Sequence, residues 1–201
     1  MAVDRHGIAE EAARLICEEQ LTDYRQAKLK ALERLGLPPR TPLPDNASIQ
    51  QAVLEYLRLF GGQAYAERLH HLRTVAVQVM RGLAPFEPRL VGAVASGAVT
   101  AAHRVQLHVF ADQPETVDVF LIDRKLRFDP GERRYRYPDG REEAVPLLCF
   151  DWSQAGVDVA VFEQDGRRRT PLNPADGLPY RRLDLAAAEA LLQATPASTS
   201  A

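Results

Sequence analysis

The sequence predicts an α+β fold, with helices in the first part of the chain and a mixed β-sheet in the second. Apolar residues recur at helical spacing through about the first 85 residues, whereas short strand-like apolar runs follow Pro85 and Pro88. The turn sequence at 137–141 contains Pro-Asp-Gly and joins two of these runs as an antiparallel hairpin. We therefore divide the chain into a helical region (1–85), an α/β core (86–165) and a tail with a short helix (166–201).

Four amphipathic helices are expected in the helical region, at 8–19, 23–35, 46–60 and about 65–83. Asp23 opens the second helix, and Gly36 stops it. Four prolines make 37–45 an extended connector, because proline removes a backbone donor and disfavours helix in the residue before it. Asn46 or Ser48 is expected to cap the third helix, which the glycine pair at 61–62 ends.

The α/β core is expected to alternate strands with a single helix. The strands are predicted at 89–95, 105–111, 134–137, 143–151 and 157–162, with the helix at 114–124. A basic run, Arg167 to Arg169, and a proline-rich stretch lead from this core to the tail helix at 184–193. Because one pair of strands is a hairpin and others are joined through the helix, the sheet is expected to be mixed.

The composition is that of an ordinary globular protein. The chain has 201 residues, of which 46% are hydrophobic and 26% charged, enough for one large domain or two small ones. A formal net charge of -2 gives no overall attraction to nucleic acid or to an anionic membrane, so we expect neither as a partner. No apolar run is long enough to span a bilayer, and the first residues lack the apolar core of a signal peptide. We therefore expect a cytoplasmic protein.

One segment carries a recognisable pattern. Residues 90–97 read Leu-Val-Gly-Ala-Val-Ala-Ser-Gly, and a strand pattern, Arg-Val-Gln-Leu-His-Val-Phe, follows at 104–110. This pattern resembles the nucleotidyltransferases of the DNA polymerase beta-like superfamily, in which a strand ends in Gly-Ser and the next strand carries Asp-x-Asp. Without a gap, the Gly-Ser pair falls on Gly92 and Ala93, and the two carboxylate positions fall on Arg104 and Gln106.

The resemblance covers about half of the chain and implies a nucleotidyltransferase-like mixed sheet from about 89 to 162. It also implies that Asp158, in the strand at 157–162, takes the place of the third acidic residue. Magnesium requires oxygen ligands, and an arginine guanidinium has only donors and a permanent positive charge. Both aspartates of the pair are thus replaced, and we expect no metal site and a catalytically degenerate protein.

Strand geometry makes this interpretation testable. Val105, Leu107 and Val109 form an apolar stripe, so Arg104, Gln106 and His108 share the opposite face. We expect Arg104 and Asp158 to meet there, so that a side-chain cation replaces the metal ion. The alternative is that Arg104 begins the strand in solvent.

The ligand expected at this site is a nucleotide or another phosphate-containing molecule. Its candidate binding residues are Gly92, Ala93, Ser96, Gly97, Arg104 and Gln106. A glycine-rich turn presents free backbone N–H groups, so Ser96, Gly97 and Arg104 together are expected to hold a phosphate. The alternative is that the glycines only permit a tight turn. A P-loop is excluded, because Ala98 and Val99 stand where Lys and Ser or Thr are required.

Two residues are candidates for catalysis, Asp158 and His108. His108 is able to act as an acid or base near neutral pH, or it is an ordinary buried histidine. If the protein is instead an active nucleotidyltransferase, it uses Mg²⁺ and a nucleoside triphosphate with carboxylates such as Asp112, Glu115 or Asp158. No nucleophile or activating carboxylate is visible beside His108 in the sequence.

Two further interpretations concern surfaces. A helical protein-interaction module predicts that the helix at 65–83 buries apolar surface against a protein partner or a second copy in a homodimer. The arginines at 133, 134 and 136 alternate with Tyr135 and Tyr137, as in a surface that stacks on nucleotides or in an ordinary two-faced strand.

Overall fold

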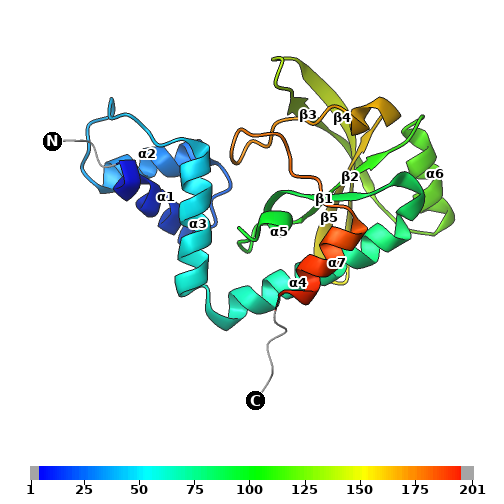
Figure 1. Cartoon of the computed structure of the whole chain (residues 1–201), viewed down its shortest axis with the longest axis horizontal. Helices are drawn as coiled ribbons and strands as arrows, with labels where there is room; N and C mark the ends of the chain where they lie inside the picture. The colour runs from blue at the N-terminus through cyan, green and yellow to red at the C-terminus, as the bar shows by residue number, and fades with distance from the viewer. Residues whose placement is uncertain (1–4, 196–201) are drawn as a thin grey trace.

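The structure, a computed structural model, describes residues 5–195 and confirms the α+β fold class (Figure 1). These residues form seven α-helices and a five-stranded mixed sheet. The first three helices stand on one side of the molecule and the sheet on the other, with α4 running along the base (Figure 1). None of the helices within 5–195 combines the length and apolar character that a membrane span requires. Residues 196–201 of the predicted tail lie outside the described part.

The first three helices form a core of their own. They are α1 (Arg5–Glu19), α2 (Tyr24–Arg34) and α3 (Asn46–Phe60). Asp23 caps α2 as expected, with its carboxylate accepting from the backbone N–H groups of Arg25 and Gln26. The cap of α3 is Asp45, which accepts from Ser48 N at 2.7 Å. The expected caps, Asn46 and Ser48, were therefore wrong. Both lie inside the first turn of α3, and the capping side chain must come before the free N–H groups of that turn.

Helix α4 (Gly62–Gly82) starts almost directly after α3, and the two glycines between them make the sharp turn possible. Gly62 has a φ of +59°, and a Cβ on Gly61 would lie 2.8 Å from Tyr65 Cβ. Beyond this turn the apolar side of α4 packs on the sheet with residues such as Leu72, Val75 and Met80. The buried cores thus divide the chain at Gly61 and Gly62, and the apolar stripe of α4 is covered by the chain itself.

The sheet has the order β1-β2-β5-β4-β3. Its strands are β1 (Arg89–Val91), β2 (Val105–Phe110), β3 (Asp129–Arg136), β4 (Glu142–Trp152) and β5 (Ala155–Phe162). β2 and β5 are parallel, with Gln106 opposite Asp158, and the other neighbouring pairs are antiparallel. The expected strand at 89–95 stops at Val91, because Gly92 has a φ of +71° and opens the short helix α5 (Gly92–Ser96).

Both faces of the sheet are covered. Val105, Leu107 and Val109 face α4, α6 (Glu115–Asp123) and α7 (Leu185–Gln193), which confirms the predicted stripe. Short 3₁₀ turns at Ala84–Phe86 and Gln164–Arg167 connect helices and strands on the two sides. The opposite face carries a second, aromatic cluster that the tail crosses at Tyr180. The part of this face near Gln106 and Asp158 borders a cavity.

Arg73 of α4 ties three helices together in the interior. Its side chain donates from Nε to Val94 O of α5 at 3.2 Å, and from Nη1 to Leu191 O of α7 at 3.5 Å and to Thr195 Oγ1. Only 7% of the residue is exposed. A cation is favourable at this place because the carbonyl ends of two helices point at it.

Replacing this guanidinium leaves buried carbonyl groups without donors. We expect Arg73→Met to lower the free energy of unfolding by about 2–4 kcal/mol, measured by urea titration. Arg73→Lys retains the charge but not the planar fork, so its loss is expected to be smaller. A Met variant within about 0.5 kcal/mol of the parent protein would show that the helices do not depend on Arg73.

Candidate functional site

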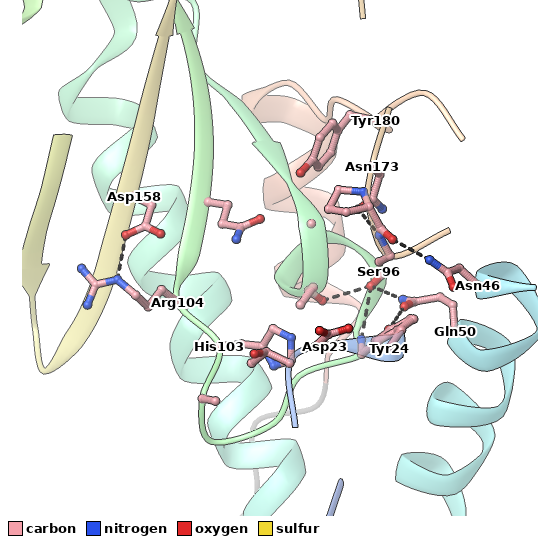
Figure 2. Close-up of a pocket in the computed structure, with 18 of the residues that line it drawn as sticks. Asp23, Tyr24, Asn46, Gln50, Ser96, His103, Arg104, Asp158, Asn173 and Tyr180 are labelled. Carbon is pink, nitrogen blue, oxygen red and sulfur yellow. Dashed lines mark hydrogen bonds and ion pairs between the residues drawn. The ribbon is translucent and has the colours of Figure 1, made fainter. Parts of the chain in front are cut away.

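A cavity of about 570 Å³ lies between the first three helices and the open part of the sheet. Its size is in the range of small-molecule sites, about 300–1,000 Å³. Figure 2 shows that its walls come from three parts of the chain. The residues that matter below are Tyr24, Arg25, Asn46 and Gln50 from the helices, Gly92, Ala93, Ser96, Arg104, Gln106, Arg133 and Asp158 from the core, and Tyr180 from the tail.

The sheet wall is built around Asp158. Its Oδ1 accepts from Arg104 Nε at 2.7 Å, and its Oδ2 accepts from Arg133 Nη2 at 2.9 Å. The contact between Arg104 and Asp158 confirms the expectation from the sequence (Figure 2). Arg133 was missed as a partner, because β3 reaches β5 only across β4 and its arginines resemble those of any two-faced strand.

The charges at this wall favour an anion over a metal ion. The Asp158 side chain is 7% exposed, whereas those of Arg104 and Arg133 are 41% and 31% exposed. Burial opposes the charge of Arg133, yet Tyr135 and Asp158 beside it raise its pKa. Two guanidinium groups thus surround one carboxylate, and both arginines line the cavity. Arg104 Nη1 also lies 3.7 Å from the exposed carboxylate of Asp151. A divalent cation at Asp158 would lie against two fixed positive charges.

Gly156 makes room for Arg104. A Cβ at this position would overlap the Arg104 guanidinium. The guanidinium donates further to Phe150 O at 3.2 Å and Val157 O at 3.4 Å. Arg104 is therefore held on the sheet by backbone groups as well as by Asp158.

Side-chain amides join the helical wall to α5 and to the tail. Gln50 donates to Ser96 Oγ at 3.0 Å and accepts from the Tyr24 hydroxyl. Asn46 donates to Pro174 O at 2.8 Å, and Lys28 donates to Asn46 Oδ1 at 2.6 Å. Figure 2 shows the contacts of Gln50 with Tyr24 and Ser96 along one side of the cavity. Sequence reasoning missed all of them, since the partners lie far apart in the chain and polar helix residues carry no distinctive spacing.

Most of the predicted ligand-binding residues line this cavity. They are Gly92, Ala93, Ser96, Arg104 and Gln106, together with Asp158. Gly97 does not line it: its N–H donates to Ala93 O at 2.7 Å, and its carbonyl accepts from the Tyr65 hydroxyl at 2.7 Å. The strand ends earlier than predicted, so Ser96 and Gly97 end a helix instead of opening one. The expected phosphate cradle of Ser96, Gly97 and Arg104 is thus replaced by a helix C-cap.

His108 lies behind the cavity. It is 1% exposed among the rings of Tyr135, Phe162 and Tyr180, and its Nδ1 accepts from Arg182 Nε at 3.1 Å. Burial, with the nearby Arg182 and Arg133 charges, holds the pKa of His108 well below its ordinary value of 6.5. The histidine is therefore neutral and covered, which matches its interpretation as a buried core residue.

Of the three acidic residues that an active enzyme was expected to recruit, Asp158 lines the cavity, whereas Asp112 and Glu115 do not. Asp112 and Glu115 follow the carboxyl end of β2, whereas Arg104 precedes its amino end, and neither acid lines the cavity. Within residues 5–195, no group of three or more His, Cys, Asp or Glu side chains is placed to hold a metal. Comparisons with protein-family models, curated proteins and solved structures found no match. The chemistry of the cavity therefore follows from its own side chains.

The role of Gly156 is testable by adding a methyl group. We expect Gly156→Ala to displace Arg104 from Asp158 and to lower the free energy of unfolding by about 1 kcal/mol, a modest value because Arg104 is partly exposed. In an Arg104→Ala background the same change should cost almost nothing, which a double-mutant cycle by urea unfolding measures. Gly131→Ala is the matched control, since the nearest atom to its Cβ would be Leu147 O at 3.9 Å. Equal losses in both backgrounds would contradict the proposed contact.

The buried His108 makes stability depend on pH. Because its pKa is lowered in the folded state, the unfolded chain binds a proton below about pH 6.5 that the folded chain does not. The free energy of unfolding should therefore fall as the pH is lowered below this value. His108→Gln keeps an acceptor for Arg182 and should reduce the slope. Burial also lowers the pKa of His103, so this histidine accounts for part of the pH dependence that remains in the variant. Urea titrations between about pH 7 and pH 5 measure how the free energy of unfolding depends on pH. If this slope is the same in the parent protein and in His108→Gln, the result counts against a neutral His108.

Proposed function

We propose that this chain is a nucleotidyltransferase-like protein without the catalytic metal site, and that its cavity binds a phosphate-bearing ligand of about nucleotide size. The observation that carries the proposal is the double arginine pairing of Asp158. A carboxylate whose two oxygens already accept from guanidinium groups is a poor metal ligand. The same arrangement is a good anchor for arginines that contact an anion.

The arrangement of the three compared positions supports the proposed resemblance. Gln106 and Asp158 are paired neighbours on the parallel strands, and Arg104 donates a hydrogen bond to Asp158. The resemblance implies that these positions meet at one site, where an active member of the superfamily holds its metal ions. A short helix after Gly92, followed by β2, also has the expected order. The replacements at Arg104 and Gln106 then remove the metal chemistry but leave the site itself.

The remaining charges of the cavity suit a phosphate. Arg25, Arg104 and Arg133 line it, against Asp23 and Asp158. Asp23 is already engaged by the first backbone N–H groups of α2, so its charge is partly neutralised. Arginine presents a planar fork of donors that matches phosphate oxygens. A ligand phosphate would bind Arg25 and those donors of Arg133 that Asp158 does not engage, beside the positive charge of Arg104, which Asp158 and two backbone carbonyls hold in place.

The neutral part of the cavity suits the rest of a nucleotide. Tyr24 and Tyr180 contribute aromatic rings from different parts of the chain (Figure 2). Gln106 contributes a carboxamide to the lining. Aromatic rings stack on nucleobases without demanding a particular one. The proposed ligand is therefore a nucleoside phosphate, bound through its phosphates by arginine and through its base by stacking.

Removing the Asp158 charge separates binding from metal catalysis. In calorimetry with pyrophosphate or ATP in EDTA, we expect Asp158→Asn to bind about five- to tenfold more tightly, since the competing carboxylate is gone. Arg104→Gln and Arg133→Gln should each weaken binding by a similar factor. Asp139→Asn is the matched control, because Asp139 pairs with Arg141 on the exposed hairpin, outside the cavity.

The opposite result would identify an enzyme. If ATP binds only with Mg²⁺ or Mn²⁺, and Asp158→Asn abolishes both binding and metal-dependent consumption of ATP while the protein stays folded, Asp158 is a metal ligand. In that case the proposed binding role is wrong, and the arginines must move away on metal binding.

A further inference from the structure

A second cavity, of about 370 Å³, lies on the opposite side of the sheet. It is formed by the end of α4, by α6 and by the end of β4, and it shares no lining residue with the first cavity. Figure 1 shows α6 on the side of the sheet away from α1–α3. The lining is mainly apolar, with Val79, Leu83, Phe120, Leu126, Phe150 and Trp152. We call it the α4–α6 groove.

The walls of the α4–α6 groove are fixed by contacts within the chain. The Trp152 indole N–H donates to Gln78 Oε1 at 3.1 Å, which holds the ring across the gap between β4 and α4. Phe120 packs edge-on against Phe86 with ring centroids 4.9 Å apart. Two aromatic walls are thus positioned in advance, which lowers the entropy that a ligand must overcome.

One edge of the groove is lined by Gly82. This glycine is exposed in the last turn of α4, and no atom would lie within 4 Å of a Cβ placed on it. Glycine therefore leaves this edge open, and a large side chain at position 82 is expected to reach into the groove.

The rim of the groove is positively charged. The Arg124 guanidinium carbon lies 3.4 Å from the Phe120 ring centroid, and Lys125 follows with a φ of +58°, in a left-handed conformation that usually favours glycine. Neither side chain has an ion pair with a carboxylate among residues 5–195. The groove therefore combines an apolar interior with cationic groups at one edge.

We propose that the α4–α6 groove binds a small amphiphilic carboxylate. Its apolar body, aliphatic or aromatic, lies between Phe120 and Trp152 over Gly82, and its carboxylate lies beside Arg124 and Lys125. The volume suits one small molecule, being near the lower limit of about 300 Å³ for such sites. The charge of the rim selects an anion over a neutral compound of the same shape. This inference does not rest on the function proposed for the first cavity.

A matched pair of variants tests the location. The probe is 8-anilinonaphthalene-1-sulfonate, an aromatic anion whose fluorescence rises in apolar sites, and octanoate is the competitor. Octanoate should displace the probe from the parent protein and from Gly82→Ala. Gly82→Phe should weaken the binding of the probe and of octanoate by about tenfold or more, because the phenylalanine ring fills the space of the ligand. Thermal unfolding confirms that both variants are folded.

A second arm tests the charge and does not depend on Gly82→Phe. In Arg124→Gln/Lys125→Gln, octanoate should bind roughly two- to fivefold more weakly, the range expected for exposed ion pairs. The neutral octanol should bind the parent and this variant equally. Arg167→Gln/Arg168→Gln, on exposed residues outside the groove, is the control for net charge.

Three results would overturn the proposal. One is displacement that Gly82→Phe leaves unchanged, which would place the probe elsewhere. Another is octanol binding the parent as tightly as octanoate, which would remove the role of the cationic rim. The third is a dimer in sedimentation velocity that Gly82→Phe abolishes, which would make the groove an interface between two copies of the chain.

Discussion

The parallel pairing of β2 with β5 is the constraint on which the rest of the structure depends. It sets two segments from distant parts of the chain side by side, in one register, and places Gln106 opposite Asp158. A parallel pair cannot be closed by a tight turn, so α6, β3 and β4 must lie between the two strands in the sequence. Both faces of the pair are then covered, one by helices and the other by aromatic rings. The first cavity occupies the remaining opening.

Electrostatics explains why this opening carries arginine. A carboxylate as buried as that of Asp158 requires cations nearby, because an unpaired buried charge is costly. In a metal site the ion meets this requirement, whereas here Arg104 and Arg133 do so from the protein itself. Because these cations belong to the chain, the positive character of the cavity is permanent. It does not depend on the supply of an ion.

The fold and part of the site could be predicted from local patterns. The period of β2 predicted its two faces, and Asp23 marked the start of α2, because both depend on neighbours in sequence. The contact of Arg104 with Asp158 followed from the resemblance together with that period. The end of β1 at Val91 was missed, since the backbone conformation of Gly92 decides it. Arg133, the amide contacts of α3 and the α4–α6 groove were missed as well, because they arise only when distant elements pack.

The abrupt turn at Gly61 and Gly62 has a consequence for the order of folding. The contacts within α1–α3 are confined to the first 60 residues, whereas the sheet is completed only when β2 pairs with β5 across the whole segment that holds α6, β3 and β4. Local contacts close small loops and form quickly, and distant strand pairing is slow. The helical unit is therefore expected to be present while the sheet is still assembling. The first cavity is then expected to form last, when the helical unit, which folds early, packs against the sheet, which folds late.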